Sequence, residues 1–267
     1  MIERRRIVDV YVDETELRVQ GRPCVLYAAV IPKDLDRAIE GLVGLKIHHG
    51  LDGNFEVKWS SPLPDAKLKA RLKEDALSIL ADHFSGLLNL SMTADKDEAF
   101  LNFLTHVESY TRSGSHHFVN LYYDRDCFRD LPRIRSVLES WRDPYCTTLA
   151  ALESRLSVPA QFADLLAGTF RYMLLRALGA VQPVVVRMEI GDSGTPEELP
   201  LDSLFHILLR YTIPGVTPEL DPNAEAFTPE HAMKECFGVG IQVNGEFTDA
   251  ELQAIRQASV FYVGCMH

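Results

Sequence analysis

The pattern of apolar and polar positions along the chain predicts alternating strands and helices. Residues 7–13 are rich in β-branched and aromatic side chains, which favours a strand. Residues 24–31 form an unbroken apolar run, which suits a strand that is buried on both faces. Gly21 lies between the two strands and permits a hairpin. Residues 34–47 place apolar side chains at helical spacing.

The rest of the chain continues this alternation, apart from residues 147–157, which fit neither pattern. We expect a short extended piece at 54–60 and strands at 87–93, 118–123, 184–189 and 237–243. We expect helices at 65–84, 96–112, 130–141, 159–178 and 248–258. Strands that come first and then alternate with helices predict an α/β fold, with a mixed sheet flanked by helices.

Composition narrows the class of protein. The chain has 267 residues, of which 46% are hydrophobic and 24% are charged, a balance that is typical of globular proteins. No stretch reaches the ~18 apolar residues of a membrane helix, and the N-terminus lacks the unbroken apolar region of a signal peptide. The five cysteines are scattered, without a Cys-x-x-Cys pair. We therefore expect a cytoplasmic protein with reduced thiols and no membrane partner.

The negative charge is concentrated near the C-terminus. The formal net charge is −11. Residues 191–267 hold 12 acids against 3 bases, a net of −9, whereas residues 1–190 hold 26 acids against 24 bases, a net of −2. We therefore expect a domain at 1–190 and an acidic C-terminal α+β extension at 191–267, packed on the same domain. Because like charge repels phosphate, the extension is not expected to line a nucleic-acid path.

Four acids stand at or near the ends of the expected elements. Asp13 and Asp124 each end a strand, Glu56 lies in the short extended piece, and Asp164 lies in a helix. A carboxylate at the carboxyl end of a buried strand points into the crevice where α/β sheets bind ligands. Carboxylate oxygens suit Mg²⁺ or Mn²⁺, and two such ions about 3.5–4 Å apart are the arrangement used for phosphodiester cleavage.

Asp164 is the most informative of these acids, because its helix is apolar on nearly every side. A carboxylate in such a helix is paired, metal-bound or protonated. Pairing with Arg171 is one alternative to a metal role. A strand-end acid such as Asp13 is also a common turn residue, and Glu56 is equally compatible with a solvated loop.

Four short motifs carry a resemblance to a known family. In chain order they are Asp-Glu-Thr at 13–15, Glu-Val-Lys-Trp-Ser at 56–60, Tyr-Tyr-Asp-Arg at 122–125 and Gln-Phe-Ala-Asp at 161–164. In this order they resemble the motifs of the uncharacterised family known as domain of unknown function 3800, over roughly residues 7–178. The resemblance implies an RNase H-like fold with the acid set of a two-metal nuclease, namely Asp13, Glu56, Asp124 and Asp164.

Two positions depart from the family motif. Thr15 stands where the family usually has Ser, and Glu16 stands where it usually has Gly. The loss of the glycine implies that the turn after the first strand differs from that of the family.

Candidate substrate contacts are Lys58, Arg125 and Gln161. Lys58 suits a scissile phosphate as a point charge, and Gln161 shares a helix face with Asp164. Two runs of basic residues are further candidates for phosphate contacts, although a solvated helix face is the alternative for most of them: Lys67, Lys69, Arg71 and Lys73, and Arg125, Arg129, Arg133 and Arg135.

The aromatic and histidine residues give weaker evidence of function. Trp59 suits base stacking, but a tryptophan beside a strand is more often part of the core. The adjacent pairs His48-His49 and His116-His117 are expected to point in different directions, and neither has the His-x₃-His spacing of a zinc site.

The sequence thus favours a metal-dependent nuclease that cleaves DNA or RNA. Mg²⁺ or Mn²⁺ would be held by the four acids, and one ion would activate water. The alternative is a non-catalytic RNase H-like binding or assembly module, in which the acids have a structural role. Uptake of Mn²⁺ by the four acids distinguishes the two hypotheses.

Overall fold

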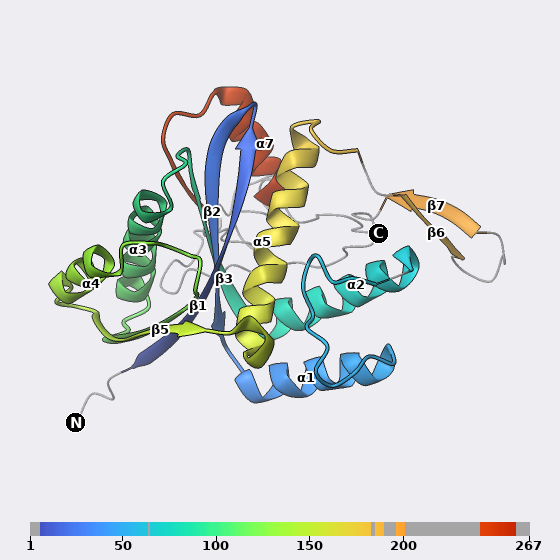
Figure 1. The fold of residues 1–267 in the computed structure, drawn as a ribbon, viewed down its shortest axis with the longest axis horizontal. Helices are drawn as coiled ribbons and strands as arrows, with labels where there is room; N and C mark the ends of the chain where they lie inside the picture. Colours follow the sequence, from blue (N-terminus) through green and yellow to red (C-terminus); the bar gives the residue numbers. More distant parts are fainter. Residues whose placement is uncertain (1–5, 64, 183–184, 190–195, 201–240, 260–267) are drawn as a thin grey trace, which may run out of the picture.

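The structure is a computed structural model that describes residues 6–63, 65–182, 185–189, 196–200 and 241–259 (Figure 1). Its main feature is a six-stranded mixed sheet with the strand order β5-β4-β1-β2-β3-β8. The strands are β1 (Ile7–Val19), β2 (Arg22–Pro32), β3 (Phe84–Ser91), β4 (Phe118–Asp124), β5 (Tyr145–Leu152) and β8 (Ile241–Asn244). A separate antiparallel pair is formed by β6 (Val185–Glu189) and β7 (Pro196–Pro200).

Strand β1 is the centre of the sheet and has a different kind of partner on each side. It pairs antiparallel with β2, through a turn at Gln20 and Gly21 where both residues have positive φ. It pairs parallel with β4 on its other side. Beyond these neighbours, β3 is antiparallel to β2, β5 is parallel to β4, and β8 is parallel to β3.

Helices cover both faces of the sheet (Figure 1). On one face lie α1 (Leu35–His48), α2 (Ala66–His83), α5 (Val158–Ala177) and α7 (Asp249–Ser259), and on the other lie α3 (Lys96–Ser113) and α4 (Leu131–Ser140). A short 3₁₀ turn, Ser154–Leu156, precedes α5. This two-sided cover explains why every residue of β3 is buried.

Side-chain caps fix where the helices begin. An aspartate or serine side chain accepts a hydrogen bond from a backbone N–H of the first turn of α1 to α5. These capping residues are Asp34, Asp65, Asp95, Asp130 and Ser157.

The prediction of an α/β fold with a mixed sheet flanked by helices is confirmed. Residues 147–157, which the pattern left ambiguous, contain six of the eight residues of the edge strand β5 and the 3₁₀ turn that follows it. Residues 54–60 form an irregular loop without a strand. None of the helices in the described residues is both long and apolar enough to span a membrane.

One prediction was wrong: Asp13 does not end the first strand. β1 continues to Val19, because Thr15 and Glu16 pair with Leu26 and Val25 of β2. The alternation of buried and exposed positions also resumes at Leu17, which is 6% exposed. The carboxylate of Asp13 therefore comes from the middle of a long central strand.

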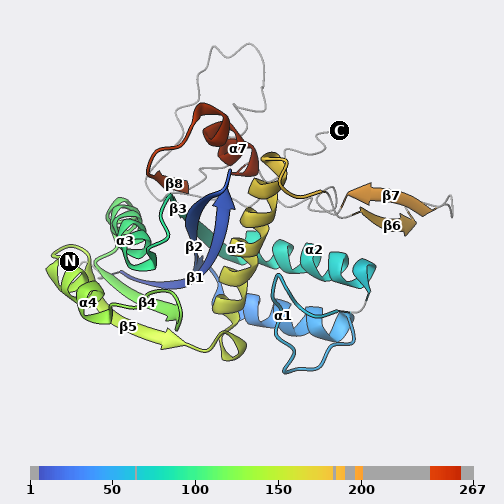
Figure 2. The same ribbon diagram turned by 45° about the horizontal axis from the view of Figure 1, so that its top comes forward.

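Two described parts of the C-terminal extension, β8 and α7, pack on the rest of the fold. β8 extends the sheet beyond β3, which Figure 2 shows, and α7 follows it. The ion pair between Arg22 Nη2 and the fully buried Glu251 Oε2 (2.5 Å) connects α7 to the start of β2. The strand expected at 237–243 is confirmed at 241–243, whereas 237–240 and the rest of 201–240 lie outside the described residues.

The loop between α1 and α2 packs closely on α5. A Cβ atom at Gly168 of α5 would lie 2.3 Å from both Cβ and Cγ of Trp59 in this loop. A side chain therefore cannot be added at position 168 unless the loop or the helix moves. Gly44 in α1 is the opposite case, because a Cβ there would meet nothing within 4 Å.

We predict that Gly168→Ala destabilises the protein by about 1–3 kcal/mol, the usual cost of overpacking. Gly44→Ala, the matched helical control, should stabilise it by about 0.5–1 kcal/mol, because alanine loses less conformational freedom in a helix. Urea denaturation of the two variants measures both effects. Equal stability of the two variants would contradict the close packing of the loop on α5.

Candidate active site

Neighbouring strands bring Asp13 and Asp124 together. Val12 of β1 is in register with Tyr123 of β4, so the next residue on each strand is one of the two acids. Tyr11 and Tyr122, also in register, stack with their ring centroids 4.8 Å apart. Because side chains two apart on a strand share a face, both acids point to the face of the sheet on which Tyr11 packs.

Helix α5 crosses this same face and contributes Asp164 (Figure 1). Burial raises the pKa of Asp13 to about 8, with further contributions from the charges of Asp164, Glu14 and Asp124. The Glu14 backbone N–H donates to Asp13 Oδ1 (2.8 Å) and partly opposes this shift. The raised pKa of Asp13 therefore reflects its position beside the carboxylates of Asp124 and Asp164.

The loop between α1 and α2 adds Glu56 and Lys58. Glu56 Oε1 accepts a hydrogen bond from Ser154 Oγ (2.5 Å) and forms an ion pair with Lys58 Nζ (3.0 Å). Burial alone would lower the pKa of Lys58, but its hydrogen bond to Glu56 and the charges of Glu56, Asp164 and Asp13 outweigh burial and raise it. Lys58 is thus a cation that interacts with three of these acids.

Asp164 connects the helix to the loop. Its Oδ2 accepts a hydrogen bond from the Trp59 backbone N–H (2.8 Å), not from Arg171. Burial raises the pKa of Asp164; the Trp59 N–H and Lys58 oppose the rise, and Glu56 and Asp124 add to it. Each of the four acids therefore acts on the pKa of another or is itself affected by one, and the structure brings together the set that the sequence singled out.

Gln161 positions the loop, contrary to the expectation that it contacts substrate. Its side chain is only 2% exposed. Its Oε1 accepts from the Val57 N–H (3.0 Å), and its Nε2 donates to the Arg155 carbonyl (3.4 Å). Gln161 and Asp164 lie on one face of α5, and from that face they bind two backbone N–H groups of the loop that carries Glu56.

The basic residues divide into different environments. Lys73 is 5% exposed, and its Nζ lies 3.4 Å from the centroid of the Trp59 ring, so it belongs to the interior and not to a solvated helix face. Trp59 also packs against Tyr172, which agrees with the core role for this tryptophan. Arg125 directly follows Asp124 and is exposed, so it is open to a ligand at the end of β4.

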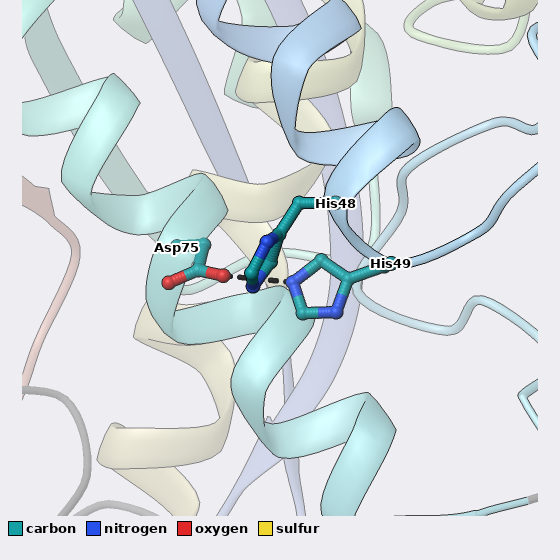
Figure 3. Close-up of side chains that lie close together, drawn as sticks. All are labelled: His48, His49 and Asp75. Atoms are coloured by element: carbon teal, nitrogen blue, oxygen red, sulfur yellow. Dashed lines mark hydrogen bonds and ion pairs between the residues drawn. The ribbon is translucent and has the colours of Figure 1, made fainter.

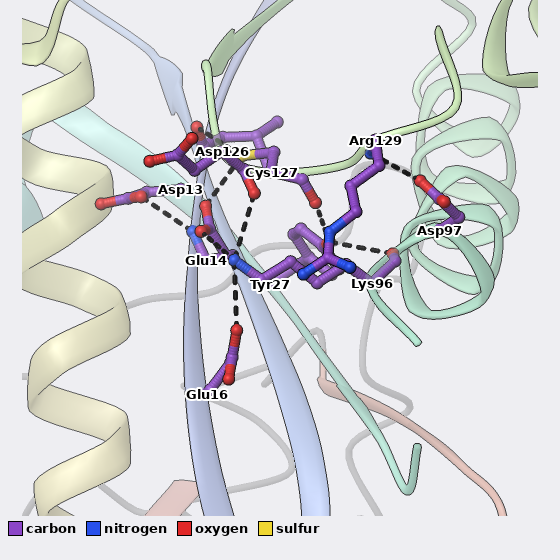
Figure 4. A network of polar contacts seen from close by, with 10 residues as sticks. Asp13, Glu14, Glu16, Tyr27, Lys96, Asp97, Asp126, Cys127 and Arg129 are labelled. Carbon is purple, nitrogen blue, oxygen red and sulfur yellow. Dashed lines mark hydrogen bonds and ion pairs between the residues drawn. The ribbon is translucent and has the colours of Figure 1, made fainter. Parts of the chain in front are cut away.

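A polar network on the opposite face of the sheet anchors the segment after Asp124 (Figure 4). Glu14 Oε1 pairs with Lys96 Nζ (2.9 Å), and the same nitrogen donates to the Asp126 carbonyl (3.1 Å). Glu14 Oε2 accepts from Cys127 Sγ (3.1 Å), and the Tyr27 hydroxyl donates to the Cys127 carbonyl.

No sequence motif pointed to this network. The sequence nevertheless contained a signal for it. A strand places consecutive side chains on opposite faces, and Glu14 follows Asp13 on a largely buried strand. Glu14 therefore had to find a partner on the α3 face, and it is only 10% exposed there.

The donor set fits hard divalent cations such as Mg²⁺ or Mn²⁺, which prefer carboxylate oxygens. Lys58 interacts with three of the four acids, and within the described residues the second oxygens of Asp13 and Asp164 accept no hydrogen bond. The acids are spread too widely to cage one ion, since the group of three described ligand residues with all donor atoms within 4.8 Å lies elsewhere. A pair of ions about 3.5–4 Å apart spreads its ligands over such a region.

Comparisons with protein-family models, with curated proteins and with solved structures found no match. The function is therefore inferred from the chemistry of these residues.

We predict that burial of Asp13 makes the metal-free protein less stable as the pH rises. The folded chain, with a pKa of about 8, binds this proton over a range in which the unfolded chain, at 3.8, has released it. Stability should therefore fall between those two values, by up to about 1.4 kcal/mol per pH unit from this group. Asp13→Asn removes the effect, so its stability advantage over the natural chain should grow from about pH 4 to about pH 8 and then level off.

Urea denaturation in the presence of a chelator, at a series of pH values, measures this difference. Parallel pH profiles for the two chains would contradict the prediction. Added Mn²⁺ should stabilise the natural chain and not the variant, because an ion that binds only the folded state raises its stability.

Proposed function

We propose that the protein is a nuclease that hydrolyses nucleic-acid phosphodiesters with Mg²⁺ or Mn²⁺ as cofactor. The observation that carries this proposal is that Asp13 and Asp124 follow paired residues of adjacent strands while the charge of Asp164, from the helix across them, acts on Asp13. Such a group of partly buried carboxylates is costly without a positive charge to offset it. Two divalent ions offset that charge, and they suit the cleavage of phosphodiesters.

Two features support an RNase H-like architecture within this proposal. The central strand β1 has an antiparallel partner on one side and a parallel partner on the other, in a sheet with helices on both faces. The acids come from adjacent strands of that sheet and from the helix that crosses them, as the resemblance of the sequence motifs implies for two-metal nucleases.

The residues of the site suit separate tasks. Asp13, Glu56, Asp124 and Asp164 would hold the ions, which supply a Lewis acid for the phosphate and a means of activating water. Lys58 is 30% exposed beside the acids and would contact a phosphate oxygen as a point charge. Arg125, exposed next to Asp124, would bind the nucleic-acid backbone.

The test is cleavage of DNA and RNA by the purified chain with Mn²⁺ or Mg²⁺. Asp13→Asn keeps the shape of the side chain but removes its charge, so we predict a loss of at least about 10²–10³-fold in rate, as for other groups of a preorganised polar site. Asp9→Asn is the matched control. Asp9 lies on the same face of β1, and its carboxylate accepts a hydrogen bond from Asn120 (2.8 Å) that an amide oxygen can also accept.

Undiminished cleavage by a folded Asp13→Asn variant would refute the assignment of this residue. Binding of nucleic acid by the natural chain, without cleavage under any divalent ion, would instead favour a non-catalytic binding or assembly module.

A further inference from the structure

A second group of metal-ligand side chains lies where α1 meets α2. His48 ends α1, His49 is its C-cap residue, and Asp75 lies in α2. His49 Nε2 and Asp75 Oδ2 are 2.7 Å apart, and the rings of His48 and His49 have centroids 4.9 Å apart. One ligand atom from each of the three residues lies within 4.8 Å of the others. Figure 3 shows the three side chains together.

We propose that His48, His49 and Asp75 bind a Zn²⁺ ion, or another divalent transition-metal ion of similar ligand preference. Two imidazole nitrogens and one carboxylate are ligands that suit zinc, whereas Mg²⁺ prefers oxygen alone. This site is separate from the acids of the candidate active site and does not depend on the proposed nuclease function.

The three ligand atoms need to move only slightly closer together to bind one zinc ion. Zinc binds nitrogen at about 2.0–2.1 Å, so two ligands of a tetrahedral site stand about 3.3 Å apart. His48 is exposed and Asp75 is 48% exposed, so both side chains are free to adjust. His49 is the fixed member, since its side chain is only 5% exposed. The ion would replace the hydrogen bond between His49 and Asp75.

The surroundings leave room for an ion. The three residues line a hollow of about 520 Å³ together with Asp65, Lys67, Arg71 and Glu74, among others. The charges of these two acids and two bases balance, so Asp75 supplies the negative charge for a cation. Three protein ligands also leave one tetrahedral position open for water or a small ligand from the hollow.

An ion at this position would affect the loop between α1 and α2. His48 and His49 lie where the loop between α1 and α2 begins, and Asp75 lies in α2, the helix that follows the loop. Glu56 and Lys58 of the candidate active site lie within that loop. A bound ion would therefore tie the start of the loop that presents Glu56 to the middle of α2, and it would stabilise the folded chain.

The experiment is a calorimetric titration of the full chain with Zn²⁺, in an Asp13→Asn background and with excess Mg²⁺ so that the four-acid site does not contribute. We expect one ion per chain and a higher melting temperature. His49→Gln and Asp75→Asn should each lower the affinity by at least about 100-fold, because the loss of even an outer-shell partner of a ligand costs about 10–100-fold. His48→Gln, at an exposed position, gives the same test if either variant fails to fold.

The matched control is His117→Gln, which alters the other adjacent histidine pair. His117 Nδ1 lies 3.6 Å from Asp143 Oδ1, but the pair lacks a third ligand atom within 4.8 Å in the described residues. This variant should bind Zn²⁺ as the parent does. Co²⁺ in place of Zn²⁺ should show d–d absorption without a thiolate charge-transfer band, since no cysteine is a ligand.

Unchanged Zn²⁺ affinity in the folded His48, His49 and Asp75 variants would overturn the proposal, as would a thiolate band or the absence of Zn²⁺ binding. None of these results tests the proposed phosphodiester cleavage, whose own test is the Asp13→Asn variant. Loss of cleavage in Asp13→Asn, in turn, has no effect on this site.

Discussion

The repulsion among carboxylates that are held together at the centre of the sheet is the constraint on which the rest of the site depends. Asp13 cannot move away from Asp124, because the register of β1 and β4 places them side by side. Asp164 cannot move away either, because its helix is packed on the same face and its carboxylate receives the Trp59 N–H. Burial and the neighbouring charges therefore raise the pKa of Asp13 to about 8. A fold that maintains this arrangement requires cations at the site or protons on the acids.

The scaffold holds the acids from both faces of the sheet. On one face, Gln161 and Asp164 bind the loop of Glu56, and the contact of Gly168 with Trp59 sets the distance between the loop and α5. On the other face, Glu14 and Lys96 hold the segment that follows Asp124. If zinc binds where α1 meets α2, it would tie the start of the same loop to the middle of α2 and so support the placement of Glu56.

Local patterns predicted the α/β architecture with a mixed sheet, and they singled out four acids that the structure brings near one another. Hydrophobic patterns located the helices α1 to α5 and the strands β1 to β4, because each helix buries one face and the strands are partly or wholly buried. The length of β1 was not predictable in the same way. Thr15 and Glu16 stay in the strand because β2 pairs with them, and this pairing is a tertiary constraint. Gln161, Lys73 and the His48–His49–Asp75 group were likewise misjudged or missed, since their partners are far away in the sequence: Asp75 lies 26 residues beyond His49.

The central claim is that the four acids together hold divalent cations, and proton release on metal binding tests it most directly. At pH 7 the raised pKa of Asp13 keeps a proton on its carboxyl group, and a metal must displace it. Calorimetric titration with Mn²⁺ in buffers of different ionisation enthalpy measures the protons released. The account predicts release of about one proton by the natural chain and none by Asp13→Asn, because carboxylate ligands bind metals in their deprotonated form. Mn²⁺ binding without proton release, or equal binding by the two chains, would contradict it.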